Sequence, residues 1–129
     1  MASRPPLAGL RVIESSLLGP AAITLHLADL GAEVIKVESP AGDYIREMTW
    51  PIVEGVSLMH LHVNRGKKSL VLDLRKPEAV AVYLDLVRGA DVVVEAMRPG
   101  SLAKRGLGFE ELIASDVLDG DGPVRVASW

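Results

Sequence analysis

A strand, a helix and a second strand follow one another within the first 38 residues, and this succession constrains the fold more than any other feature of the sequence. Residues 10–14 form a short run rich in strand-forming residues, an alanine-rich segment extends from Pro20 to Gly31, and residues 32–38 alternate apolar and charged side chains. Proline suits the first turn of a helix and glycine its C-terminal end. Two strands joined by one helix form a βαβ unit with parallel strands. We therefore predict an α/β, Rossmann-like fold: a mainly parallel sheet with flanking helices.

The remaining segments extend this pattern. Pro77 begins a second helix that Gly89 ends, and residues 90–95 form an apolar run typical of a strand buried on both faces. Residues 39–56 hold four prolines and glycines without a sustained period, so we expect loops and short turns there. We also expect strands at 69–73 and 124–128, and short helices at 57–62, 102–105 and 109–113.

Charge and composition exclude several classes of protein. The 129 residues carry a formal net charge of −3, whereas general nucleic-acid binding requires a basic surplus. The basic residues instead cluster at 65–76 and 98–105, which suits a small polyanion, although solvated surface charge explains such clusters equally well. No apolar stretch reaches the roughly 20 residues of a membrane span. Cysteine is absent. We expect a soluble, cytoplasmic protein that binds neither nucleic acid nor membrane.

The sequence departs from two common phosphate-binding motifs. The turn at residues 15–20 lacks the glycines of a dinucleotide fingerprint, although Glu38 ends the second strand where a ribose-binding acid would stand. The basic run at 64–69 precedes a strand, whereas a P-loop lysine opens a helix. The run nevertheless offers mobile cations, with Arg75 following, for charge-assisted bonds to phosphate. His60 and His62 lack further metal ligands nearby, so we expect no metal.

Six motifs in order give the sequence a family resemblance. They are Pro-Leu-Ala-Gly-Leu-Arg-Val (6–12), Leu-Gly-Pro (18–20), Leu-Ala-Asp-Leu-Gly-Ala-Glu-Val-Ile-Lys-Val-Glu (27–38), Asn-Arg-Gly-Lys-Lys-Ser (64–69), Leu-Asp-Leu-Arg (72–75) and Ala-Asp-Val-Val-Val-Glu-Ala-Met-Arg-Pro-Gly (90–100). Together they resemble the N-terminal segment of the class III CoA-transferases, which include formyl-CoA and carnitine CoA-transferases and 2-methylacyl-CoA racemases. The resemblance implies a truncated form of that family's large domain.

The resemblance also implies coenzyme A, free or as acyl-CoA, as the ligand. It places Leu17 and Leu18 at the nucleotide end of the ligand, and residues 72–75 (Leu72, Asp73, Leu74 and Arg75) beside the adenine and phosphates. Ala96, Met97 and Arg98 would contact the pantetheine or diphosphate, and Lys104 a phosphate.

In the family, a catalytic aspartate attacks the acyl-CoA thioester, and no residue of this sequence matches it. After residue 115 the sequence departs from the family pattern, so we expect a CoA-binding segment at 1–115 and an atypical tail at 116–129. We predict a CoA-binding part that is catalytically incomplete alone. Two alternatives stay open: a subunit that completes a transferase or racemase with a longer homologous chain, and a non-catalytic remnant used for association. A homo-oligomer is also expected.

Overall fold

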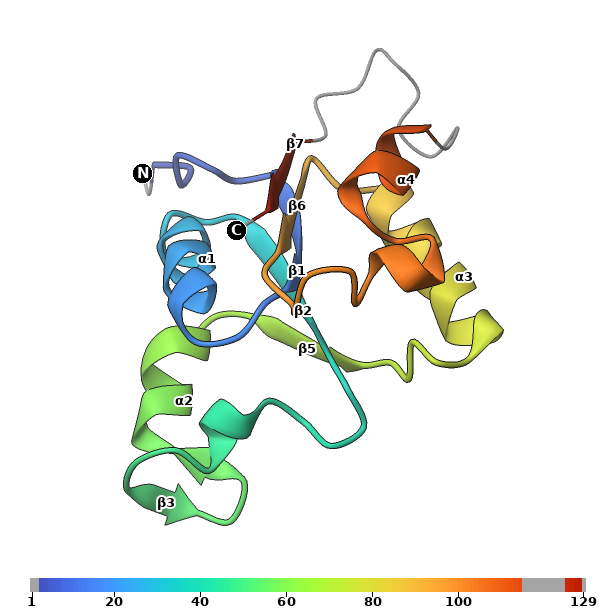
Figure 1. The fold of residues 1–129 in the computed structure, drawn as a ribbon. Coiled ribbons are helices and arrows are strands. Elements are labelled where there is room, and N and C mark those ends of the chain that lie inside the picture. Colours follow the sequence, from blue (N-terminus) through green and yellow to red (C-terminus); the bar gives the residue numbers. More distant parts are fainter. Residues whose placement is uncertain (1–2, 115–124, 129) are drawn as a thin grey trace.

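Five parallel strands form the central sheet of the protein (Figure 1). The computed structural model describes residues 3–114 and, for the backbone alone, residues 125–128. The strand order is β5-β2-β1-β6-β7. The strands are β1 (Arg11–Ser15), β2 (Glu33–Glu38), β5 (Lys68–Val71), β6 (Val92–Glu95) and β7 (Arg125–Ser128). The parallel α/β sheet predicted from the sequence is confirmed.

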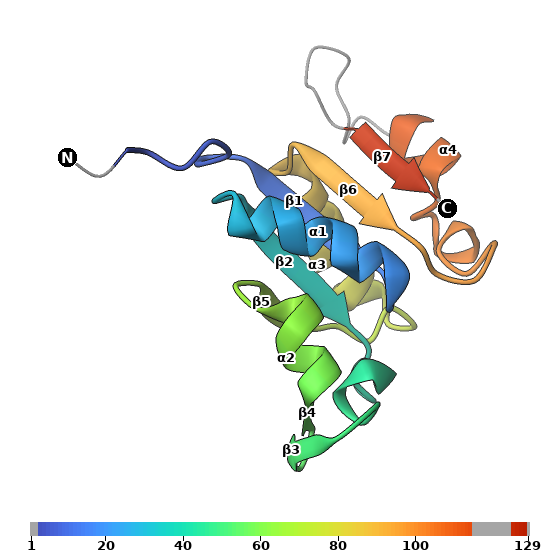
Figure 2. The same cartoon turned by 90° about the vertical axis from the view of Figure 1, so that its left-hand side faces the viewer.

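Helices cover both faces of this sheet (Figures 1 and 2). Helices α1 (Gly19–Asp29) and α2 (Leu58–Asn64) lie on one side, whereas α3 (Pro77–Arg88) and α4 (Phe109–Ala114) lie on the other. Short 3-10 helices occur at η1 (Tyr44–Arg46) and η2 (Ala103–Arg105). No helix in the described part of the chain is long and apolar enough to cross a membrane.

Alternation along the strands divides the core into two layers, because successive side chains of a strand point to opposite faces. Ile13 and Val93 pack with Tyr83 and Val87 of α3, and all four are fully buried. Val12 and its neighbours Val34 and Val94 form the other layer, against Leu27 and Ala28 of α1. Burial on both faces confirms the prediction for β6.

One element differs from the sequence prediction. The segment expected to contain only loops and turns includes a small antiparallel hairpin, β3 (Pro51–Val53) and β4 (Val56–Ser57). All three residues of β3 are exposed, so no alternation of buried and exposed side chains marks the strand in the sequence. The hairpin protrudes from the sheet beside α2 (Figure 2).

The other predicted elements occur where expected, with ends shifted by one or two residues. The helix predicted at 57–62 continues to Asn64, and the final strand is present as β7. The acidic turn-rich stretch at 116–123 lies outside the described residues. The boundary between residues 115 and 116 therefore stays a prediction.

Candidate functional site

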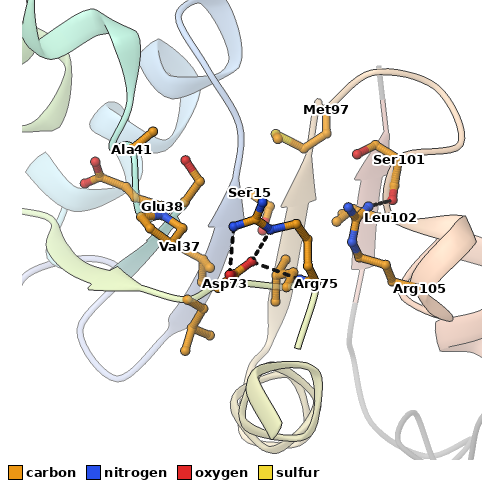
Figure 3. Close-up of a pocket in the computed structure, with 14 residues that line it drawn as sticks. Ser15, Val37, Glu38, Ala41, Asp73, Arg75, Met97, Ser101, Leu102 and Arg105 are labelled. Carbon is orange, nitrogen blue, oxygen red and sulfur yellow. Dashed lines mark hydrogen bonds and ion pairs between the residues drawn. The ribbon is translucent and has the colours of Figure 1, made fainter. Parts of the chain in front are cut away.

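A cleft of about 320 Å³ opens at the carboxyl edge of the sheet (Figure 3). Ser15 ends β1, Val37 and Glu38 end β2, residues 72–75 follow β5, and Met97 follows β6, and all of them line the cleft. The chain leaves β1 toward β2 on one side, while β6 lies on the other side of β1. Open α/β sheets bind ligands in the crevice at such a change of direction.

The walls of the cleft are mainly apolar, with polar groups at a few points. Apolar side chains come from β2, from the segment after β5, and from the segments after β6. They are Val37, Pro40, Ala41, Leu72, Leu74, Met97 and Leu102. Polar side chains are contributed by Glu38, Asp73, Arg75, Arg105 and three serines. A concave, mostly apolar surface with a few placed polar groups is the usual form of a small-molecule site.

Arg75 is held in place at the cleft by Asp73. Its Nε lies 2.7 Å from Asp73 Oδ1 and its Nη2 lies 2.9 Å from Oδ2 (Figure 3). These hydrogen bonds lower the pKa of Asp73 from 3.8 to about 2, so the pair is charged at neutral pH. The Arg75 side chain is still 75% exposed. An oriented and accessible guanidinium suits a phosphate group.

Five of the ten predicted site residues line this cleft: Leu72, Asp73, Leu74, Arg75 and Met97. The backbone amide of Ala96 instead donates to the Ser15 carbonyl, 3.1 Å away, and joins the ends of β6 and β1. The next residue, Met97, is also restrained, because its amide donates a hydrogen bond of 2.6 Å to Glu95 Oε1. The residues 72–75 and 96–97, far apart in sequence, therefore meet at one edge.

The other predicted residues do not line the cleft. They are Leu17, Leu18, Ala96, Arg98 and Lys104. Leu18 is exposed and has φ 46, a left-handed value that is unusual for a residue other than glycine. Arg98 and Lys104 are exposed, and neither forms an ion pair with a residue that the structure describes. Their ammonium and guanidinium groups remain available to a ligand that extends beyond the cleft.

The basic run at 64–69 does not supply the free cations expected from the sequence. The Lys67 side chain is only 2% exposed, and its Nζ lies 2.9 Å from Glu14 Oε2 and 2.8 Å from the Ala21 carbonyl oxygen. Arg65 pairs with Asp29, and Lys68 with Glu33. The expectation of mobile cations is therefore wrong for Lys67, whose side chain belongs to the interior, whereas Arg65 and Lys68 are exposed and form ion pairs with acidic side chains.

Lys67 is one member of a buried charge network between the sheet and α1. Glu14 and Lys36 occupy inward positions of β1 and β2, and Lys36 Nζ lies 3.0 Å from both Glu14 Oε1 and Asp43 Oδ2. Thr24 donates a hydrogen bond of 2.6 Å to Glu14. The side chains of Glu14, Lys36, Asp43 and Lys67 are at most 2% exposed. Buried charges of both signs need such pairing to be tolerated.

The network shifts the pKa of two of its members, Glu14 and Lys67. Burial raises the pKa of Glu14, but attraction to Lys36 and Lys67 outweighs it, and the pKa lies below its ordinary value. For Lys67, burial lowers the pKa and outweighs the opposing attraction to Glu14, so its pKa lies below the ordinary value. The network gave no local signal in the sequence beyond charges at inward strand positions. Its partners come from β1, β2 and two distant loops.

Glu38, considered above as a possible ribose-binding acid, is fully engaged by the protein. Arg46 donates two hydrogen bonds to its carboxylate, at 2.8 and 2.7 Å, and Ser69 donates a third at 2.7 Å. The amide of Asp43 donates a fourth at 3.0 Å. Although burial raises the pKa of Glu38, these bonds lower it from 4.5 to about 2. With four donors bound, Glu38 has little capacity left for a ribose hydroxyl.

His60 lies against this cluster and shows no metal-binding arrangement. Its Nε2 is 3.2 Å from Arg46 Nη1, and its Nδ1 is 3.0 Å from Asn64 Nδ2. Burial and the nearby Arg46 charge lower the pKa of His60, which favours the neutral ring. Within residues 3–114 and 125–128, no group of three or more histidine, aspartate or glutamate side chains is placed to hold a metal ion.

Sequence reasoning missed part of the cleft lining. Pro40 and Ala41, together with Ser15, Val37, Ser101 and Leu102, line the cleft without having been predicted as ligand-binding. The position of Pro40 and Ala41 just after a predicted parallel strand is the signal that could have found these two residues, because carboxyl ends of such strands meet at one edge.

Comparison with known proteins identifies the family of this chain. Residues 7–116 match the model of CoA-transferase family III. The chain belongs to this family. Among curated relatives, succinate–glutarate CoA-transferase of Agrobacterium fabrum is 48% identical over 118 residues, which cover 84% of this chain and 29% of the relative. Human succinyl-CoA:glutarate CoA-transferase is 44% identical over 83% of this chain and 25% of its own length.

Solved structures of the family have the same fold. A mutant of Rv3272 from Mycobacterium tuberculosis superposes with a TM-score of 0.80 at 40% identity, covering 96% of this chain and 32% of that one. A CAIB/BAIF family protein from Brucella suis gives a TM-score of 0.78 at 43% identity, over 87% of this chain and 31% of that one. This CoA-transferase family III chain therefore corresponds to about a quarter to a third of the length of these relatives.

Proposed function

We propose that this chain is the CoA-binding part of a class III CoA-transferase. The observation that carries the proposal is the cleft at the carboxyl edge of the sheet, where apolar walls adjoin the guanidinium of Arg75. CoA combines an adenine base with several phosphates, and this cleft offers a surface for each kind of group. A volume of about 320 Å³ suits one end of the molecule, and the rest would extend toward Arg98 and Lys104.

We further propose that the chain alone binds CoA without transferring an acyl group. Transfer through a mixed anhydride requires a carboxylate that is free to attack a thioester. Near the cleft, Asp73 is paired with Arg75, and Glu38 accepts four hydrogen bonds. Both carboxylates have a lowered pKa, which reduces their nucleophilicity. The pairing supports a binding role for this region.

A second candidate function is that of a subunit that completes an active enzyme with a homologous chain. Two relatives support it: the alpha and beta subunits of succinyl-CoA–L-malate CoA-transferase from Chloroflexus aurantiacus, 39% and 42% identical to this chain. A partner chain could supply the nucleophile that this chain does not. The acyl-CoA to test first is succinyl-CoA, because several relatives are named for it.

Calorimetric titration with CoA tests the binding proposal. Arg75→Gln removes the accessible guanidinium and should weaken binding about tenfold, the effect of losing a charge-assisted hydrogen bond. Arg88→Gln is the matched control, because Arg88 also forms a short-range exposed pair, with Asp85, but ends α3 away from the cleft. It should leave the affinity unchanged.

Added salt should also weaken binding, because it screens exposed charges. A folded wild-type chain that does not bind CoA would reject the proposal. Succinyl exchange by the chain alone would contradict the proposed catalytic incompleteness, whereas exchange only after addition of a longer homologous chain would support the second candidate.

A further inference from the structure

Ser39, Pro40 and Ala41 form a short wall of the cleft after β2, and the hydrogen bonds of Ser39 with Gly42 lie within this segment. All three residues line the cleft and all three are exposed. Within this segment, the amide of Gly42 donates to the Ser39 carbonyl at 2.8 Å, and Gly42 has φ 77, which suits glycine. The position of the wall therefore depends on how its two ends are attached to the rest of the protein.

Both ends are attached to the Glu38 cluster, defined as Glu38, Arg46, Ser69 and the amide of Asp43. Glu38 ends β2 immediately before the wall, and the amide of Asp43, two residues after Ala41, donates to Glu38 Oε2 at 3.0 Å. One carboxylate thus closes the loop across its base. Its side chain is only 2% exposed, so competition from water is small.

Arg46 is the member of the cluster that fixes the orientation of this carboxylate. Its Nε and Nη2 donate to the two oxygens of Glu38 at 2.8 and 2.7 Å, the two-point geometry by which a guanidinium orients a carboxylate. A lysine at this position has one point charge and cannot reproduce both bonds. Ser69 donates to the same carboxylate from the neighbouring strand β5.

We propose that Arg46 is a positioning residue for the CoA cleft, which holds the Ser39–Ala41 wall in place by orienting Glu38. Arg46 does not line the cleft itself, so its effect reaches a ligand through Glu38 and the loop that Glu38 closes. The proposal rests on the proposed function for the identity of the ligand. The order of the wall can be measured without any ligand.

The test combines amide hydrogen exchange with CoA titration of the intact chain. Arg46→Gln should speed exchange of the Asp43 amide about tenfold and weaken CoA binding at least about fivefold, because the carboxylate is no longer held for that amide. Arg46→Lys should restore part of both effects. Arg65→Gln is the matched control, since Arg65 also makes a two-point pair, with Asp29, that joins α2 to α1 outside the cleft.

The comparison of these variants distinguishes a positioning role of Arg46 from a general loss of stability. Arg65→Gln should change exchange at Asp43 and affinity for CoA by less than about twofold. Equal effects of Arg46→Gln and Arg65→Gln, or unchanged exchange and affinity in a folded Arg46→Gln protein, would overturn the positioning role. If Arg46→Gln does not fold, Ser69→Ala removes one donor to Glu38 and should give the same changes in smaller measure; no change there would overturn the role.

If the wild-type chain does not bind CoA, the proposed function fails separately. The exchange measurement then decides the positioning role alone: faster exchange confined to residues 39–43 supports it, and unchanged exchange rejects it.

Discussion

At the scale of single residues, the ionisable side chains near the cleft are tied to specific partners. Asp73 is bound by Arg75, Glu38 by Arg46 and Ser69, and both carboxylates have a pKa of about 2. Of these, Glu38 is the more informative for stability, because its side chain is buried whereas Arg75 is largely exposed.

The lowered pKa of Glu38 predicts how stability depends on pH. Its folded pKa of about 2 lies below the ordinary 4.5, so the charged form stabilises the fold fully above pH 4.5 and this stabilisation is lost as the pH falls through 2. Glu38→Gln lacks this titration. Urea unfolding measured from pH 2 to 6 should give the wild type a free energy of unfolding about 2 kcal/mol higher than that of the variant at pH 6. This difference should shrink as the pH falls toward 2. A constant difference would contradict the assignment.

At the scale of elements, the buried charge network joins β1, β2 and α1 with the loops that contain Asp43 and Lys67. Lys36 Nζ donates to Glu14 and to the Ser16 carbonyl, 2.7 Å away, and lies 3.0 Å from Asp43. The turn that precedes α1 is therefore held by β2 through Lys36.

Removal of Lys36 should be far more destabilising than removal of a surface lysine. Lys36→Met leaves Asp43 without its buried cationic partner and leaves Glu14 paired with Lys67 alone, and it should lower the free energy of unfolding by about 3–5 kcal/mol. Lys68→Met breaks a pair in which the lysine is 69% exposed and should cost less than about 1 kcal/mol. Chemical denaturation of both variants measures the contrast, and equal losses would contradict the role assigned to the network.

Elements of the sheet could be predicted because their signals are local. Alternation marks β2, an apolar run marks β6, and Pro77 and Gly89 delimit α3. The hairpin at β3 and β4 could not, because its side chains are exposed and show no period. The burial of Lys67 could not either, since its partners Glu14 and Ala21 lie 53 and 46 residues away, counted as 67 − 14 and 67 − 21.

For the site, residues 72–75 and Met97 were predicted through the family resemblance and do line the cleft. Pro40 and Ala41 were missed although they follow a predicted strand, because their place beside these residues depends on the pairing of β2 with β5 and β1. Short-range patterns do not contain that pairing.

At the scale of the whole molecule, six of the exposed large apolar side chains lie on the protruding segment from η1 through β3 to α2. They include Trp50, which is 79% exposed, and Ile52 and Val53, which are 55% and 60% exposed. Tyr44, Leu58 and Leu61 add further exposed apolar area on the same elements. Exposed patches of apolar side chains are typical of surfaces that contact another protein.

This surface predicts concentration-dependent self-association of the purified chain. Ile52→Lys should shift the sedimentation profile toward monomer, because it places a charge among these side chains. Val82→Lys is the control, since Val82 is 44% exposed but lies on α3 across the sheet. A wild-type protein that sediments as a monomer at all concentrations would contradict the prediction.

The central claim, that the carboxyl-edge cleft binds CoA, is tested most directly by following backbone amide NMR signals during titration with CoA. The account predicts shifts at residues 37–41, 72–75 and 96–105, with little change on β3 and α2. Shifts concentrated on β3 and α2, or no shifts from a folded sample, would contradict it.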